Sequence, residues 1–273
     1  MKLHHLAIVA LTLTACGSKS SDTEVATSLL NKATTACNEG RYDEAVQLLD
    51  SINRAYPHEI DVRRQALLLQ PKVAEAASQQ QLLDNRSETD LAQKQLEALM
   101  PFFNTYASDG KDRLEGYYEE KSTPANFRSR NTIVARVNQA GEFVVISSVT
   151  NNTAHHTAVT LTDAASGTSA TSGTVAYRGN PDKLSTESVR FTGELADTIG
   201  AFCSGVGARS LRLDFAGTAK IATTLSASEV AAIGRSWELS RAITRLQMLQ
   251  SQRERLEAKV QLSRDQQARQ QAD

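Results

Sequence analysis

The sequence predicts an α+β protein with helices at both ends of the chain and a β-rich middle. Apolar residues recur at helical spacing from Glu24 to Met100, and short β-branched runs separated by turn residues follow. Residues 226–273 contain no proline and one glycine, which is typical of a long helix. We therefore expect five segments: a signal peptide (1–15), a tether (16–23), a helical domain (24–121), a β-rich domain (122–225) and a long C-terminal helix (226–273).

The composition is that of an ordinary globular protein and makes some functions poor candidates. Of its 273 residues 40% are apolar and 22% are charged, and the formal net charge is −1. No excess of positive charge is present to neutralise phosphates, so we expect no nucleic-acid partner. Aromatic residues make up 5% of the chain, which leaves few side chains for stacking platforms or for large core anchors.

The first residues have the pattern of a secretory signal. After Lys2, the apolar run from Leu6 to Leu13 is too short to span the roughly 30 Å of a bilayer core. The run ends in Leu13-Thr14-Ala15-Cys16, which resembles the lipobox of bacterial lipoproteins. This resemblance implies cleavage before Cys16 and acylation of Cys16, enough to anchor a peripheral protein stably to a membrane. The alternative is an ordinary secretory signal with a chance cysteine.

The residues after Cys16 indicate the membrane to which the protein is sorted. Gly17 in place of an aspartate resembles the outer-membrane sorting pattern, and no acidic cluster for export to the cell surface follows it. We therefore expect a lipid-anchored outer-membrane protein that faces the periplasm. A disulfide between Cys37 and Cys203 could persist there. Because both lie in apolar helical surroundings, where free cysteines are also common, the sequence leaves their pairing open.

The predicted helical domain begins with a helical hairpin. Its first helix ends at Gly40, where a C-terminal cap is expected, and its second ends at Pro57. Residues 26–59 resemble one tetratricopeptide repeat, with Ala33 and Ala45 at the two small positions of the helix crossing. Because the next stretch does not repeat this pattern, we expect a single repeat-like hairpin. An unrelated helical hairpin is the alternative.

Further helical segments are expected before the β-rich domain. They cover Ile60–Gln70, Lys72–Leu83 and Leu91–Met100, with Pro71 as a kink or a first-turn residue. An aromatic cluster follows, which we expect to pack at the junction with the next domain rather than to stack on a ligand. Its members are Phe102, Phe103, Tyr106, Tyr117 and Tyr118.

The middle of the chain predicts a small antiparallel sandwich or open barrel. A short helix over 194–203 interrupts its strands. The expected strands are Thr132–Asn138, Glu142–Thr150, Thr157–Thr162, Gly173–Arg178, Ser188–Thr192, Ser210–Phe215 and Lys220–Leu225.

No residue of this chain is predicted to be catalytic, and no metal or cofactor is expected. His155 and His156 are adjacent, so on a strand their side chains point to opposite faces and do not share one ion. The chain has no nucleophile elbow, phosphate-binding glycine loop or HExxH motif. A hydrolase stays an alternative that a cleft holding a carboxylate pair, or a serine contact to either histidine, would favour.

The C-terminal segment predicts the longest helix. Ser226 and Glu229 have capping-box spacing, and two apolar positions repeat in heptads as far as Val260. Arg253 interrupts the heptads, which makes a strong coiled coil less favourable. The helix has three candidate uses: packing on the N-terminal helices, pairing with a second copy, or reaching another envelope component.

The leading functional hypothesis is a non-enzymatic scaffold or adaptor. It is anchored to the membrane through lipid on Cys16 and contacts a protein partner, or a second copy, through its helices. The second hypothesis is a β-rich domain that binds a glycan or peptidoglycan fragment. Its stacking platform would be Tyr177, Phe191 or the Tyr117-Tyr118 pair, and a cluster of exposed aromatic side chains would favour it.

Overall fold

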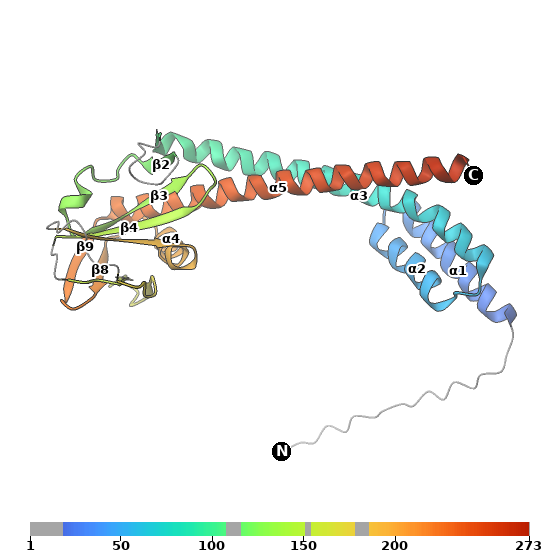
Figure 1. Ribbon diagram of the computed structural model, residues 1–273, viewed down its shortest axis with the longest axis horizontal. Helices are drawn as coiled ribbons and strands as arrows, with labels where there is room; N and C mark the ends of the chain where they lie inside the picture. Colours follow the sequence, from blue (N-terminus) through green and yellow to red (C-terminus); the bar gives the residue numbers. More distant parts are fainter. Residues whose placement is uncertain (1–18, 108–115, 151–153, 178–185, 273) are drawn as a thin grey trace, which may run out of the picture. The chain divides into compact units, whose positions relative to one another are not determined.

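The computed structural model describes residues 19–107, 116–150, 154–177 and 186–272, and it confirms the α+β class. The predicted signal peptide and Cys16 lie outside these residues. The chain divides into two compact units. The helical unit comprises Met1–Asn85 with Gln252–Asp273, and the β unit comprises Arg86–Ser251. Two long helices, α3 (Ile60–Leu99) and α5 (Ala227–Ala272), contribute residues to both units (Figure 1).

The helical unit is built on a hairpin of α1 (Lys19–Asn38) and α2 (Tyr42–Ala55), against which the first part of α3 packs (Figure 1). Gly40 makes the turn with a φ of +77°, a conformation that favours glycine. Small side chains at the crossing let the helix backbones approach closely. The core contains Ala26, Leu30, Ala33, Ala36, Ala45, Leu49, Ile52, Val62, Ala66 and Val73.

Helix α1 begins earlier than predicted, and part of the expected tether is therefore helical. Residues 19–23, predicted as tether, form the first turn of α1. Asp22 lies in this turn, where a negative charge is stabilised by the helix dipole. The boundary at residue 24 was wrong because the polar residues before it are compatible with a solvated first turn.

Helix α3 is one continuous helix, where a separate helix from Leu91 was predicted and Pro71 was predicted as a kink or a first-turn residue. Pro71 lies inside it, and a proline within a helix leaves the carbonyl four residues earlier without its usual donor. That carbonyl belongs to Leu67, and the side-chain amide of Gln270 on α5 donates to it at 3.0 Å. In the same unit Glu75 accepts from Arg264 and Gln267, each at 2.7 Å. Of the three predicted uses of the C-terminal helix, packing on the N-terminal helices is therefore observed.

The β unit contains two antiparallel sheets. The five-stranded sheet has the order β1-β2-β3-β4-β7, and the four-stranded sheet has the order β6-β5-β8-β9. The strands of the first sheet are β1 (Phe103–Tyr106), β2 (Tyr117–Glu120), β3 (Thr132–Asn138), β4 (Phe143–Val149) and β7 (Glu187–Thr192). Those of the second sheet are β5 (Ala158–Thr162), β6 (Ser169–Thr171), β8 (Leu211–Ala216) and β9 (Ile221–Leu225).

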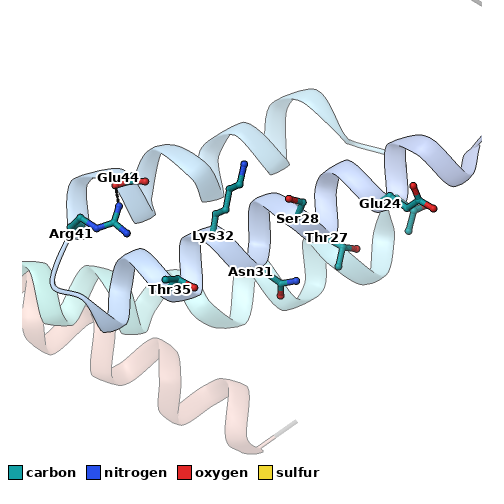
Figure 2. A pocket seen from close by; sticks show the side chains of 9 residues that line it. Glu24, Thr27, Ser28, Asn31, Lys32, Thr35, Arg41 and Glu44 are labelled. Atoms are coloured by element: carbon teal, nitrogen blue, oxygen red, sulfur yellow. Dashed lines mark hydrogen bonds and ion pairs between the residues drawn. The ribbon is translucent and has the colours of Figure 1, made fainter.

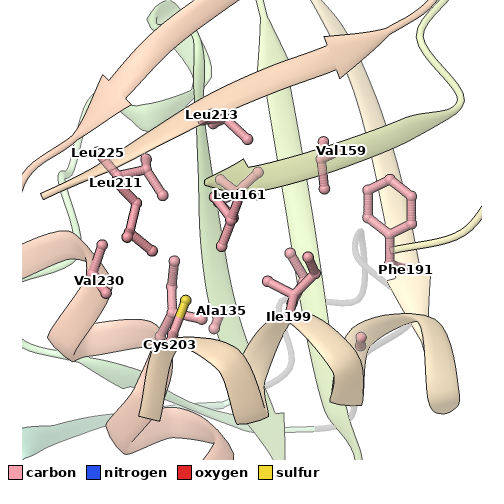
Figure 3. Packing of buried hydrophobic residues seen from close by; sticks show 14 of the residues in the cluster. Ala135, Val159, Leu161, Phe191, Ile199, Cys203, Leu211, Leu213, Leu225 and Val230 are labelled. Atoms are coloured by element: carbon pink, nitrogen blue, oxygen red, sulfur yellow. The ribbon is translucent and has the colours of Figure 1, made fainter. Parts of the chain in front are cut away.

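One apolar core joins the two sheets to α4 (Glu194–Val206) and the first turns of α5. Figure 3 shows Ile199 and Cys203 of α4 packing beneath Leu161 and Leu211 of the second sheet. The predicted capping box is present at the start of α5. The Ser226 backbone N–H donates to the Glu229 carboxylate at 2.9 Å, and the Glu229 N–H donates to the Ser226 hydroxyl at 3.3 Å.

Two predictions about the strands were wrong. Strands β1 and β2 lie within residues 24–121, which were predicted to be helical, because β1 pairs with β2 and β2 pairs with β3. The predicted strand from Gly173 forms no strand in its described part, and β6 pairs with β5 instead. The aromatic cluster also divides: Phe103 enters the core of the β unit, whereas Phe102 and Tyr106 are exposed.

Candidate functional site

The β unit contains a buried cluster of three polar side chains. Ser147 on β4 lies 2.7 Å from Nε2 of His156, measured from the serine Oγ. His156 precedes β5, and its Nδ1 lies 3.4 Å from a carboxylate oxygen of Glu187 at the start of β7. The order of atoms, hydroxyl to Nε2 and Nδ1 to carboxylate, is the one that a serine hydrolase uses to activate its nucleophile. The serine–histidine contact that would favour a hydrolase is thus present.

The same cluster is closed to solvent. Ser147 and His156 are fully buried, and Glu187 is 4% exposed. The Ser147 hydroxyl is also 3.1 Å from the carbonyl of Val189, to which it donates. A nucleophile must reach a substrate carbonyl, so this arrangement cannot act as an acyl-transfer site without exposing Ser147. As it stands, the cluster links β4, β7 and the segment before β5 through hydrogen bonds.

The environment of His156 favours its neutral form. Burial lowers the pKa of His156 below the ordinary 6.5, and hydrogen bonding and charge from Glu187 oppose this shift only in part. The His156 ring also meets Phe215 edge-on, with centroids 5.5 Å apart. One carboxylate oxygen of Glu187, Oε1, has no hydrogen-bond partner in the described part of the chain. A neutral imidazole suits a structural role at this position.

The two adjacent histidines differ in exposure. His156 is buried, whereas His155 is exposed and its ring contacts that of Tyr177, with centroids 4.6 Å apart and the planes tilted by 35°. The residues that the structure describes hold no group of three or more His, Cys, Asp or Glu side chains able to bind a metal ion.

The predicted glycan platforms differ in accessibility. Phe191 is fully buried because strand alternation on β7 places it on the core face, so its prediction as a stacking platform was wrong. Tyr177 is 41% exposed. Tyr117 is half-buried and stacks on the exposed Tyr106 with centroids 5.0 Å apart and 18° between the ring planes.

The helical unit has an open polar groove of about 550 Å³ along α1 (Figure 2). All nine lining residues are exposed, and seven of them come from one face of α1, opposite the alanines of the core. They are Thr23, Glu24, Thr27, Ser28, Asn31, Lys32 and Thr35 of α1, together with Arg41 and Glu44 at the α2 end. The lining is therefore rich in hydroxyl and amide groups.

Only some charges of the groove are neutralised within the chain. Arg41 is held by the carboxylates of Glu39 and Glu44, whose hydrogen bonds raise the pKa of the guanidinium. By contrast, the side chains of Lys32 and Asn31 make no hydrogen bond or ion pair with any other described residue. A cation and an amide are thus available to a ligand in the middle of the groove.

Cys37 and Cys203 are both free thiols. Cys203 is fully buried in the core of the β unit, where burial raises the pKa of its thiol to about 12. Cys37 is half-buried against the core of the helical unit. The Cys203 thiol therefore lacks the lowered pKa that a reactive cysteine needs.

The chain matches no protein-family model, no curated protein and no solved structure. Within the described residues, no helix has a stretch long and apolar enough to cross a membrane.

Sequence reasoning missed both the buried cluster and the groove. Ser147, His156 and Glu187 come from three separate segments, and only the histidine stood out among many serines and glutamates. The groove had a signal that could have been recognised. Polar residues repeat at positions 23, 24, 27, 28, 31, 32 and 35, which is the complement of the apolar spacing that predicted α1.

Proposed function

We propose that this protein is a lipid-anchored adaptor of the cell envelope whose helical unit binds a protein partner along the α1 groove. The observation that carries the proposal is the groove itself, with its unpaired Lys32 and Asn31 beside a row of hydroxyl groups. Amide and hydroxyl side chains donate to and accept from the main chain of an extended peptide. Lys32 would pair with an acidic side chain of that segment.

The proposed anchor brings the groove close to the membrane. Helix α1 begins at Lys19, three residues after Cys16. Three extended residues span at most about 11 Å, so acylation of Cys16 would keep the helical unit near the headgroups. We therefore expect a partner that is itself in or near the outer membrane.

The anchor is tested with Cys16→Ser. Metabolic labelling with an alkyne-tagged fatty acid should modify the wild-type protein and leave the variant unlabelled. The variant should also lose tight association with the membrane fraction. Equal labelling of both proteins, or wild-type association of an unlabelled variant, would contradict the lipoprotein assignment.

The groove is tested by photo-crosslinking in cells. A photoreactive amino acid at Asn31 should give a discrete crosslinked product, because this position lies in the middle of the groove. The same amino acid at Lys72, an exposed position of α3 in the same unit that does not line the groove, is the matched control. Equal products from both positions would mean that the groove has no special role.

A hydrolase is the second candidate, because the atom order of Ser147, His156 and Glu187 favours it. A fluorophosphonate probe labels serine nucleophiles that are accessible and activated. We expect no labelling that depends on Ser147, since this residue is fully buried. If the wild-type protein is labelled and Ser147→Ala abolishes the labelling, the adaptor proposal is wrong and the protein is a serine hydrolase.

A further inference from the structure

The outward face of the five-stranded sheet has an ordered stack of side chains that none of the functions considered so far requires. Tyr106 of β1 and Tyr117 of β2 are directly paired across the strands, and their rings stack. The guanidinium of Arg136 on β3 lies 4.2 Å from the Tyr117 ring centroid and 5.7 Å from that of Phe127. We call these four side chains the stacked ladder.

The stacked ladder is buried at one end and open at the other. Phe127 is 6% exposed and the Arg136 side chain 8%, whereas Tyr106 is 39% exposed. Since β1 is the edge strand of the sheet, the ring face of Tyr106 that turns away from Tyr117 faces outward from the edge. Among the residues that the structure describes, the exposed end of the ladder is thus the ring of Tyr106.

The ladder holds this ring in a fixed orientation. Tyr106 is supported by Tyr117, and Tyr117 is supported by the Arg136 guanidinium through a cation–π contact. Arg136 is itself fixed by Glu119, with 2.7 Å between Nε and the carboxylate oxygen. A ring that is already ordered loses little conformational entropy when a ligand binds, which favours binding at this position.

The surroundings of the ring select the chemistry of the ligand. The ion pair with Glu119 neutralises Arg136, so the ladder offers no free cation to a phosphate or a carboxylate. Asn104 lies two residues before Tyr106 on the same face of β1 and is exposed, so its amide can donate to and accept from hydroxyl groups. An apolar ring face beside a neutral amide suits a neutral ring with one apolar face and hydroxyl groups at its edge.

We propose that the stacked ladder is a binding site for a neutral saccharide, in which Tyr106 stacks on a pyranose ring and Asn104 hydrogen-bonds its hydroxyl or acetamido groups. This site is in the β unit and is independent of the proposed partner groove in the helical unit. An adaptor with such a site would contact a glycan and a protein through different units.

The test is titration of the full mature chain in detergent with two probes, a tetramer of N-acetylglucosamine and a tetramer of glucose. We expect weak saturable binding of at least one probe by calorimetry. Tyr106→Ala should weaken it about fivefold or more, the effect of losing one aromatic stacking contact. Tyr106→Phe should retain binding, because the ring face is unchanged.

Tyr177→Ala is the matched control, since Tyr177 is 41% exposed in the same unit and contacts a neighbouring ring in a tilted, unstacked geometry. It should bind like the wild type, and thermal unfolding should show that both alanine variants are folded. Preference for the N-acetylglucosamine probe would indicate a cell-wall type of glycan, and preference for the glucose probe would indicate a neutral glucan. Binding of neither probe, or equal loss in the Tyr106 and Tyr177 variants, would overturn the proposal.

Discussion

Replacement of His156 by alanine should destabilise the β unit more than almost any other single substitution in this chain. The change removes a 2.7 Å hydrogen bond to Ser147, worth about 1 kcal/mol. It removes the edge-on contact with Phe215, worth about 0.5–1.5 kcal/mol. It also leaves the buried Glu187 carboxylate without this neighbour, at a cost of about 1–3 kcal/mol. We expect the free energy of unfolding to fall by about 3–5 kcal/mol.

The assay is urea unfolding followed by tryptophan fluorescence. The chain has a single tryptophan, and Trp237 packs against the core of the β unit, so the signal reports on this unit. Ser147→Ala should cost about 1–3 kcal/mol, because it removes the hydrogen bonds of this hydroxyl to His156 and to the Val189 carbonyl. Catalytic clusters are often strained, and truncating them often stabilises a protein. A His156→Ala variant as stable as the wild type would therefore refute the structural role that we assign to the cluster.

The same histidine predicts a dependence of stability on pH. Its pKa is lowered in the folded protein, while in the unfolded chain it takes the ordinary 6.5. As pH falls below 6.5, the unfolded state binds a proton that the folded state does not, so the protein loses stability toward acid. The His156→Gln variant cannot titrate there and should show a flatter dependence between pH 7 and pH 5. An unchanged slope in this variant would contradict the assignment.

Three more outcomes follow from the packing. Gln270→Ala should lower the free energy of unfolding of the helical unit by about 0.5–1.5 kcal/mol, because the Gln270 amide donates to the Leu67 carbonyl that Pro71 leaves without a donor. Unfolding followed by far-ultraviolet circular dichroism measures this loss, and Gln266→Ala, at an exposed position of the same helix, should not show it. Gly200→Ala should cost about 1–3 kcal/mol, because a Cβ there would lie 2.5 Å from the Trp237 ring. Cys203 should resist maleimide at pH 8 until urea unfolds the β unit, because it is buried and its thiol pKa is about 12. A rapid reaction in native protein would contradict this burial.

Elements whose local signals agree with their tertiary setting were predicted well. The strand Thr132–Asn138 was predicted at the bounds of β3, since it is β-branched and ends before a turn at Gly141. The start of α5 was also predicted, because the capping box of Ser226 and Glu229 is a local interaction.

Elements that depend on distant partners were predicted poorly. Pro71 was expected to kink a helix or to open a new one, and the sequence could not decide between them. Helix α3 continues through Pro71, and Gln270, far along the sequence, donates to the freed carbonyl. Strands β1 and β2 have few residues each, and their extended form depends on pairing of β1 with β2 and of β2 with β3. The cluster at His156 could not be predicted because it requires the pairing of β4 with β7 and the placement of the segment before β5 against both strands.

The most direct test of the adaptor is the affinity of the protein for the partner crosslinked at Asn31, once that partner is purified. We predict that the double substitution Asn31→Ala with Lys32→Ala weakens binding about tenfold or more, by removing the unpaired amide and cation of the groove. Lys72→Ala removes the same charge outside the groove and should leave the affinity unchanged. Equal affinities for the wild type and the double variant would contradict the central claim that the α1 groove binds the partner.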